Sequence, residues 1–510
     1  MEKTIELRDI TKTFGSIVAN KNACLKVHSG EILALLGENG SGKTTLMNML
    51  SGLYYPDSGE IFINNKEVHI TSPKDAYSFG IGMVHQHFKL IDVFTASENI
   101  ILGLKGRFFI HKKYVTNKIQ ALLDRYGFKL DLNKKIYDMS VSEKQTVEII
   151  KVLYRGADTL ILDEPTAVLT PQETDRLFSI LRKMKEDGKT IIIITHKMQE
   201  VLSLSDKVAV LRKGQVVKVV ETNKANQEEL ADLMVGEHVT LHIDRNEPIN
   251  PTKVLEVRHL TCYNEEKLKS LDDVSFDCYS GEILGIAGVS GSGQKALLEA
   301  ISGLQKAENG SEIVFFDKNN VKDNLIGKNP KVIKKMGVSL AFVPEDRLGM
   351  GLVGDMGMVG NMLLRSYETG FSPFLNVKKP TELATDVKEK LEVLTPSIQT
   401  PVRKLSGGNV QKVLVGREIA SQPRLLLTAY AVRGLDINTS YTIYNLLNME
   451  KKNGMAIVYV GEDLDVLLAL TDRIMVLCDG KVTGIVDSRT TDKKTIGKLM
   501  AATKEAKTNE

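Results

Sequence analysis

Residues 32–45 read Ile32-Leu33-Ala34-Leu35-Leu36-Gly37-Glu38-Asn39-Gly40-Ser41-Gly42-Lys43-Thr44-Thr45, and this stretch decides the fold. The apolar run before Gly37 predicts a buried strand, and the run from Thr45 to Leu50 predicts a helix. Between them, residues 37–44 match G-x-x-x-x-G-K-[ST], a loop whose backbone amides surround phosphate groups at a helix N-terminus. In such a loop Lys43 neutralises phosphate oxygens and the Thr44 hydroxyl holds Mg²⁺. The string alone also fits a simple glycine turn, but its place between strand and helix favours a nucleotide phosphate site.

The chain contains a second copy of this pattern. Residues 29–37, Ser-Gly-Glu-Ile-Leu-Ala-Leu-Leu-Gly, return as Ser-Gly-Glu-Ile-Leu-Gly-Ile-Ala-Gly at 280–288, an offset of 281 − 30 = 251. A later landmark recurs at an offset of 405 − 139 = 266. Such self-similarity indicates a duplicated architecture. We expect a first domain with complete motifs over residues 1–236, a linker over 237–252, a second domain with degenerate motifs over 253–500 and a charged tail over 501–510.

Composition places the chain among ordinary soluble globular proteins. It has 510 residues, of which 42% are hydrophobic and 26% charged, and this excludes a disordered chain. The net charge of 67 − 64 = +3 gives no sign of a nucleic-acid or anionic membrane partner. The apolar runs are too short for a spanning helix and the start has no signal-peptide pattern, so we expect a cytoplasmic chain. The four cysteines (Cys24, Cys262, Cys278 and Cys478) lack metal-site spacing and are expected to be reduced packing residues.

Each half alternates short apolar runs with helical patterns. Strands are predicted over Thr159–Leu162 and Lys189–Thr195, with a helix over Glu173–Asp187 between them. This alternation is typical of an α/β core with buried parallel strands. Residues 88–155 and 349–419 are richer in helical periodicity and predict a helical subdomain inserted into each core.

Two of these predicted strands end in chemistry-bearing residues. Asp163 and Glu164 close the first strand, where Asp163 could bind Mg²⁺ and Glu164 could polarise an attacking water. His196 follows the second strand, at the edge where parallel sheets place ligand-contacting groups. A solvated strand end and a structural histidine are the plain alternatives. In combination with the phosphate loop, the three residues predict an ATP-hydrolysing site with His196 near the γ-phosphate.

These motifs resemble the nucleotide-binding domains of ABC transporters. The resemblance rests on residues 37–45, Gln86, Asp163-Glu164-Pro165-Thr166, His196, and Leu405-Ser406-Gly407-Gly408-Asn409-Val410-Gln411. Over residues 4–500, the doubled form is similar to the tandem ATPase subunits of bacterial sugar and nucleoside importers. It implies that Gln86 senses the γ-phosphate beside the metal and couples to a membrane partner, and that Phe14 stacks on adenine. Phe14 could equally be a core residue.

The second half keeps the glycines of the loop but replaces the side chains that would bind phosphate and metal. Gly288, Gly291 and Gly293 preserve the loop, while Gln294 and Lys295 replace Lys43 and Thr44. At the later offset the counterparts of Asp163, Glu164 and His196 are Ala429, Tyr430 and Glu462. The counterpart of Gln86 is Glu345, in the run Val343-Pro344-Glu345-Asp346-Arg347. The first half has the opposite defect, because it reads Met139-Ser140-Val141-Ser142-Glu143 where the second keeps Leu405–Gly408. The resemblance implies that each ATP lies between one glycine loop and the other half's signature, so one site is complete and the other is structural or regulatory.

The resemblance implies that the function is that of an importer ATPase that uses ATP and Mg²⁺. It implies two integral membrane permease subunits, an extracytoplasmic substrate-binding lipoprotein, a place on the cytoplasmic face of the membrane, and no nucleic acid. A tandem ABC protein of ribosomes or nucleic acid would keep both sites and a long linker, and a scaffold without turnover would not need a complete site. The runs at 82–88 and 166–173 resemble the nucleoside (basic membrane lipoprotein-associated) branch more than the ribose or galactose branch.

Overall fold

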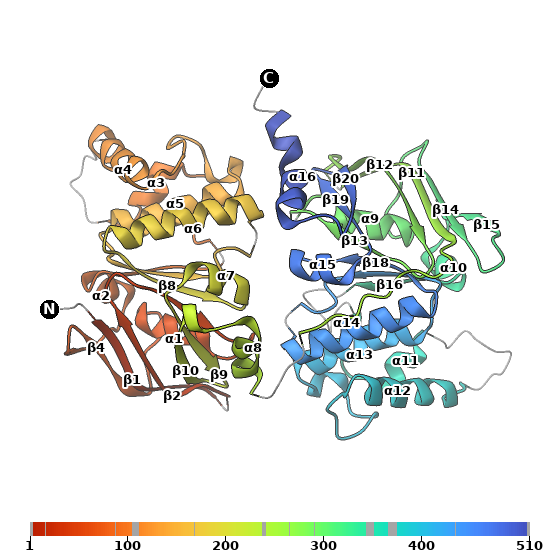
Figure 1. The fold of residues 1–510 in the computed structure, drawn as a ribbon, viewed down its shortest axis with the longest axis horizontal. Coiled ribbons are helices and arrows are strands. Elements are labelled where there is room, and N and C mark those ends of the chain that lie inside the picture. The colour runs from red at the N-terminus through yellow and green to blue at the C-terminus, as the bar shows by residue number, and fades with distance from the viewer. Residues whose placement is uncertain are drawn as a thin grey trace. The chain divides into compact units, whose positions relative to one another are not determined.

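The computed structural model describes residues 4–506, except 16, 87, 105–111, 168, 237–240, 265, 290, 343–350, 366–374 and 434. The chain divides into two compact units, residues 1–240 and 241–510 (Figure 1). Both are α/β units that repeat one plan, as the sequence predicts.

The centre of the first unit is a mainly parallel sheet. Its order is β10 (Gln215–Glu221), β9 (Lys207–Arg212), β3 (Ile32–Leu36), β8 (Thr190–Thr195), β7 (Thr159–Asp163) and β6 (Ile81–Val84). Strands β9, β3, β8, β7 and β6 pair in parallel, and β10 pairs antiparallel with β9. Strands β3, β7 and β8 are buried along their whole length, as parallel strands covered on both faces require. Their carboxyl ends therefore meet at one edge.

A smaller antiparallel sheet packs beside this core. Its order is β2 (Ile17–His28), β1 (Thr4–Phe14), β4 (Ser58–Ile63) and β5 (Lys66–Val68). Apolar residues of β1 and β2 form one cluster with β3 and with helix α1 (Lys43–Leu50). The other helices outside the insertion are α2 (Pro73–Ser78), α6 (Pro171–Glu186), α7 (Met198–Leu204) and α8 (Gln227–Val235). The cluster fixes the phosphate loop between the two sheets.

A helical segment lies between β6 and β7, where the sequence predicts an inserted subdomain. It contains α3 (Ala96–Ile101), α4 (Lys112–Tyr126) and α5 (Val141–Tyr154), and α5 packs against both others. Asn99 is buried and holds the preceding loop, because its amide donates to Ile91 O at 3.1 Å and accepts from Ile91 N at 2.8 Å. The segment is thereby joined to the loop that leaves β6.

The second unit repeats both sheets. The core order is β16 (Val338–Phe342), β17 (Leu425–Ala429), β18 (Ala456–Val460), β13 (Ile283–Ala287), β19 (Arg473–Cys478) and β20 (Lys481–Asp487). The smaller sheet is β12 (Lys269–Tyr279), β11 (Lys253–Tyr263), β14 (Glu312–Phe316) and β15 (Lys322–Asn324). Its helices are α9 (Gln294–Ile301), α10 (Pro330–Lys335), α11 (Met358–Leu363), α12 (Lys378–Lys390), α13 (Gly407–Ala420), α14 (Ile437–Lys452), α15 (Leu464–Leu470) and α16 (Lys493–Ala506). Helix α16 includes the first residues of the segment expected as a charged tail.

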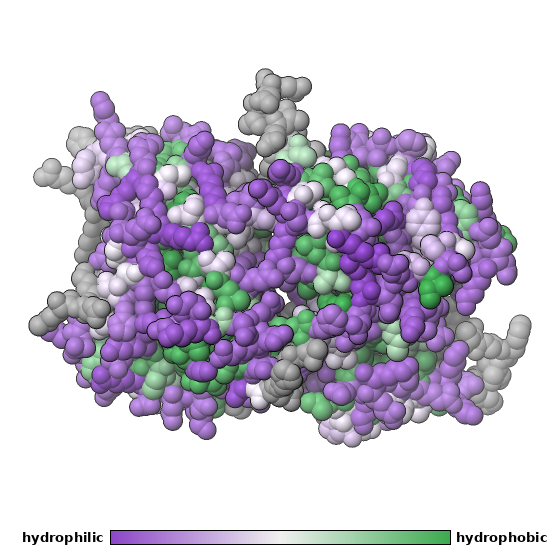
Figure 2. Space-filling model, viewed as in Figure 1, coloured by the Kyte–Doolittle hydropathy of each residue, from purple (hydrophilic) through white to green (hydrophobic). Residues whose placement is uncertain are grey.

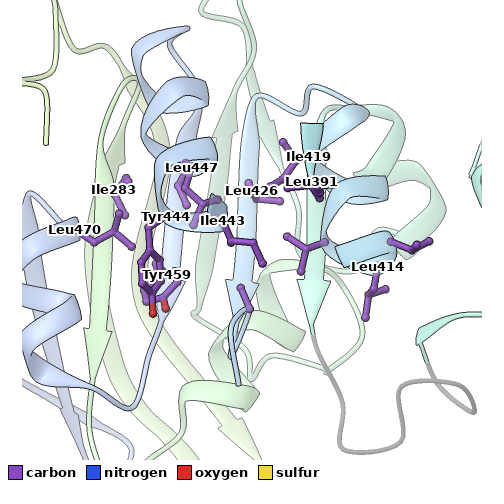
Figure 3. Close-up of a cluster of buried hydrophobic side chains, with 14 of the residues drawn as sticks. Ile283, Leu391, Leu414, Ile419, Leu426, Ile443, Tyr444, Leu447, Tyr459 and Leu470 are labelled. Carbon is purple, nitrogen blue, oxygen red and sulfur yellow. The ribbon is translucent and has the colours of Figure 1, made fainter. Parts of the chain in front are cut away.

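One core cluster of the second unit joins its helices to the sheet (Figure 3). Leu414 and Ile419 of α13, Leu447 of α14 and Leu426 of β17 are fully or nearly fully buried in it. Tyr444 and Tyr459 meet there edge to face, with ring centres 6.4 Å apart. This packing holds the middle and the end of α13 against the sheet.

Two residues inside the predicted linker (237–252) form hydrogen bonds with the second unit. The Arg245 guanidinium donates to Leu468 O and Thr471 O, and Lys451 donates to Asn246 O. Residues from 241 onward group with that unit.

The surface view is mainly hydrophilic with scattered apolar residues (Figure 2). Among the helices of the described residues, none is both long and apolar enough to cross a bilayer. Cys262, Cys278 and Cys478 are buried, and Cys24 is exposed.

Candidate functional site

The first glycine loop joins β3 to α1 and is shaped for phosphate. Gly40 and Gly42 have φ of 81° and 99°, a left-handed conformation that glycine adopts without strain. A Cβ on Gly42 would also collide with Ala19 O, so only glycine fits there. Helix α1 begins directly after Gly42 without a side-chain cap or an acidic residue in its first turn. Its N-terminal amides and the positive end of its dipole are those of an anion site.

Lys43 lies inside this loop. It is buried, and its ammonium donates to Gly37 O at 2.7 Å and to Glu38 O at 2.8 Å. Burial lowers the pKa of Lys43, and the carboxylates of Glu164 and Asp163 act in the opposite direction. The ammonium is therefore held where it can exchange carbonyl contacts for phosphate oxygens.

Thr44 and Asp163 come together as the sequence predicts. The Thr44 hydroxyl donates to Asp163 Oδ1 at 3.3 Å, across the junction of α1 and β7. Burial raises the pKa of Asp163 to about 6, against the lowering effect of the Thr44 hydrogen bond. A hydroxyl and a carboxylate are ligands that suit Mg²⁺ beside a nucleotide, which supplies further oxygens. No group of three or more His, Cys, Asp or Glu suited to a metal occurs in the described part of the chain.

Glu164 contacts both of the other predicted catalytic residues, Gln86 and His196. Its carboxylate accepts from Gln86 Nε2 at 3.0 Å and pairs with His196 Nδ1 at 2.9 Å. Burial favours a raised pKa for Glu164, but the hydrogen bond and charge of His196, with Lys43, outweigh it and lower the pKa. Glu164 is thus an ionised carboxylate held from two sides. Gln86, predicted near the metal, donates to this carboxylate.

Phe14 is a surface residue at the end of β1. Its side chain is 42% exposed and meets Tyr54 edge to face, with ring centres 5.2 Å apart. The Lys12 ammonium lies 5.6 Å from the Phe14 ring centre. The alternative of a core residue is therefore wrong, and the role of stacking on adenine stays a prediction.

The second glycine loop keeps the backbone and changes the interior. Gly291 and Gly293 have φ of 90° and 105°, matching the first loop. The Gln294 amide donates to Val289 O at 3.1 Å, so a neutral group stands where the first loop holds an ammonium. Lys295 points away to solvent and lies 3.7 Å from Glu299 on the same helix. Among the described residues of the second loop, no cation takes the place of Lys43.

The second strand edge carries a different set of side chains. Tyr430 follows β17 with its ring 5.8 Å from the Arg433 guanidinium, and Arg433 lies 3.9 Å from Glu462. Ala429 offers no metal ligand. Glu345, the expected counterpart of Gln86, lies outside the described residues. Glu462, at the position of His196, therefore contacts Arg433.

The two signature helices begin differently. Ser406 caps α13 by accepting from Asn409 N at 3.4 Å and from the Asn409 amide at 2.8 Å. In the first unit, Ser140 accepts from Glu143 N at 3.2 Å, and Ser140 N donates to the Glu143 carboxylate at 2.7 Å. This capping box places a negative charge at the start of α5. The α13 start, with Leu405 and the small residues Gly407 and Gly408, presents no such charge.

Two supporting residues, Asn20 and Glu200, lie outside the motifs, and a third, Thr166, belongs to a motif that gave it no role. Asn20 is fully buried and donates to Gly42 O at 3.3 Å. Thr166 and Glu200 share a hydrogen bond of 2.6 Å behind the catalytic edge. Their counterparts in the repeat are Leu271, Val432 and Val466. A position-by-position comparison of the two halves would have revealed them.

Comparisons with known proteins agree with this geometry. The sequence model described as "ABC transporter" matches residues 20–167 and 271–428. The nucleoside import ATP-binding protein NupA of Lactococcus lactis subsp. cremoris is 41% identical over 508 residues, covering 98% of each chain. The guanosine import ATP-binding protein NupO of Bacillus subtilis is 41% identical over 506 residues, again covering 98% of each chain. The ribose import ATP-binding protein RbsA of Clostridium tetani is 36% identical, covering 94% of each chain.

Proposed function

Because the chain belongs to the ABC transporter family, we propose that it is the ATPase subunit of an importer whose cargo is nucleosides. The ATP-binding and ATP-hydrolysing role follows from the family match in both halves. The observation that carries the cargo is the 41% identity, along nearly the whole chain, to two import subunits named for nucleosides.

Deletion of this subunit should abolish uptake of labelled nucleosides. A competition assay against ribose decides between the two branches, since a ribose import subunit is 36% identical over a similar length. Loss of ribose or galactose uptake with intact nucleoside uptake would mean that the chain serves a monosaccharide importer. The uptake assay reads the cargo directly, which the residues facing ATP do not.

The first unit supplies the groups for hydrolysis. Lys43 binds the β- and γ-phosphate oxygens, and Glu164 accepts a proton from the attacking water. His196 holds this carboxylate at 2.9 Å, and in the proposed site it would contact the γ-phosphate. Mg²⁺, held by Thr44, Asp163 and Gln86, would neutralise charge on the transferred phosphoryl group.

We propose, from the resemblance, that the second unit's signature completes this site. We assign Ser406, Gly407 and Gly408 as γ-phosphate contacts, because the α13 start offers a serine and uncharged amides. The opposite pairing would join Gln294 to a helix that begins with Glu143. Replacing a charged donor by a neutral one loses about 1.5 to 3 kcal/mol of binding. Losing a general base costs roughly 10² to 10⁴-fold in rate, so hydrolysis belongs to the first glycine loop.

Membrane partners follow from the importer role. We propose two integral membrane permease subunits, an extracytoplasmic binding lipoprotein, and a peripheral position on the cytoplasmic face of the membrane. Ile91 and Val93, which lie between Gln86 and α3, are 40% and 64% exposed and give the permease an apolar contact. Purification from native membranes should recover the complex. Recovery with ribosomes or nucleic acid, and never with a membrane protein, would overturn this assignment.

A further inference from the structure

Glu200 of α7 contacts both loops that carry the proposed catalytic pair. Its carboxylate accepts from the buried Thr166 hydroxyl at 2.6 Å, and Thr166 lies two residues after Glu164. The same oxygen accepts from the Thr195 hydroxyl at 3.4 Å, and Thr195 directly precedes His196.

Lys197 completes this cluster, which we call the Glu200 clamp (Thr166, Thr195, Lys197 and Glu200). Its ammonium lies 3.1 Å from the Glu200 carboxylate and donates to Thr166 O at 3.4 Å. Its backbone amide donates to the Thr195 hydroxyl at 3.0 Å. The clamp therefore joins the residues on both sides of His196 to the loop that follows Glu164.

The second half has lost the clamp at every position. Its counterparts are Val432, Gly461, Asp463 and Val466, so both hydroxyls, the lysine and the Glu200 carboxylate are replaced. The backbone link between the same two strands is kept in both halves, with Glu164 N to Ile194 O at 2.9 Å and its counterpart at 3.0 Å. The clamp is thus dispensable for the fold of the strand edge and is absent where the catalytic side chains are absent.

We propose that Glu200 is a positioning residue that holds Glu164 and His196 at their contact distance during hydrolysis. Strands β7 and β8 are parallel neighbours, but each ends before its catalytic side chain, so the two loops need a separate connection. A hydroxyl donating to a carboxylate at 2.6 Å is a short, charge-assisted hydrogen bond that fixes such a connection. This proposal rests on the catalytic role proposed for Glu164.

The test uses the full chain assembled with its membrane partners. Glu200→Val and Thr166→Val copy the second half. Each should lower kcat by roughly 10- to 100-fold, the loss that a misplaced catalytic group brings. The KM for ATP should stay within about twofold, because the glycine loop is not touched. Thr166→Ser keeps the hydroxyl and should restore the wild-type kcat.

Two further variants make the outcome decisive. The double variant Thr166→Val/Glu200→Val should be no slower than Glu200→Val alone, because each substitution removes the same hydrogen bond between Thr166 and Glu200. Val466→Ala, at the matched place in the second half, should leave kcat unchanged. A wild-type kcat in Glu200→Val, or a Thr166→Ser variant as slow as Thr166→Val, overturns the clamp. So does a parallel change of kcat, KM and Tm in Thr166→Val.

Glu164→Gln serves as the reference. If it is inactive while Glu200→Val is fully active, the clamp alone is wrong. If Glu164→Gln keeps the wild-type rate, the catalytic assignment itself has failed.

Discussion

The two strand edges of this chain share a backbone and differ in chemistry. Glu164 and Tyr430 both follow a buried strand, and both adopt the left-handed region, at φ of 45° and 56°. Their amides donate to Ile194 O at 2.9 Å and to Val460 O at 3.0 Å. Left-handed non-glycine residues are commonly taken as signs of active sites. Here the conformation persists without a catalytic side chain, so it belongs to the way the chain leaves the sheet.

The helix starts show the same division with the roles exchanged. Both α5 and α13 begin at a serine cap, so the capping geometry is a property of the fold. Only α5 adds the carboxylate of Glu143, which Lys134 pairs at 2.9 Å. A carboxylate at a helix start occupies the favourable end of the dipole that a phosphate would use. The first half has therefore kept the carboxylate at the strand edge, and the second half has kept the uncharged start of the signature helix.

The sharpest way to break this comparison is Glu164→Gln. We call the proposal that only the site of the first glycine loop hydrolyses ATP the asymmetric assignment. If it holds, turnover in the assembled transporter should fall by at least about 10²-fold, the loss expected for a general base. The closed, ATP-bound form should accumulate, because phosphate binding through Lys43 is kept. Steady-state ATPase rates and nucleotide retention measure both effects. A variant with half the wild-type rate would reveal two working sites.

Ser406→Arg tests the same site from the other half. A long cation at the cap of α13 blocks the proposed phosphate contact, and we expect a loss comparable to that of Glu164→Gln. Combining the two substitutions should add little, since residues that act in one site are not additive. If Ser406→Arg leaves the ATPase rate unchanged, the signature of the second half does not serve the first glycine loop.

The comparison also extends to stability through a repeated ion pair. Lys451 and Asp472 are 2.7 Å apart with side chains 1% and 7% exposed, while Lys185 and Asp206 are 2.5 Å apart at 36% and 38%. Removing one partner of a buried pair costs about 3 to 5 kcal/mol, and an exposed pair contributes about 0 to 1 kcal/mol. Lys451→Met should therefore destabilise its unit far more than Lys185→Met. Hydrogen exchange of the β18 and β8 amides resolves the units separately, and equal effects would contradict the difference in burial.

The strands and the phosphate loop were predictable because local patterns determine them. The strand over Ile32–Leu36 is found at those bounds, since a fully buried parallel strand is a continuous apolar run. The helix expected from Glu173 begins earlier, at Pro171. Thr170 caps it in a capping box with Glu173, and proline suits the first helical position. That signal is present in the sequence and places the helix start at Pro171.

The supporting contacts could not be predicted in the same way. Glu200 reaches Thr166 across two neighbouring strands, so its role depends on sheet order and register. Asn20 reaches Gly42 from β2 by a similarly distant contact. A single polar residue on a short helix or strand is typical of a surface position. Only the internal repeat marks these residues, because it replaces them together with the catalytic groups.

The smallest expected effects are those of Tyr430→Ala and Ser140→Ala. Tyr430 has no metal ligand beside it, since Ala429 replaces Asp163, and its contacts are to Arg433 rather than to an imidazole. The Ser140 hydroxyl oxygen already accepts a hydrogen bond from Glu143 N, at 3.2 Å. Each substitution should therefore change the ATPase rate by only about two- to fivefold, through cap or packing losses of about 1 kcal/mol.

Tyr430→Glu sharpens the same point. It restores the carboxylate at the conserved left-handed position, and the asymmetric assignment predicts no gain in rate in a Glu164→Gln background. The general base alone cannot work without the ammonium and metal ligand that Gln294, Lys295 and Ala429 have replaced. Recovery of turnover in that double variant would show that the second glycine loop still holds ATP in a reactive geometry. The difference between the halves would then lie in one residue rather than in the whole edge.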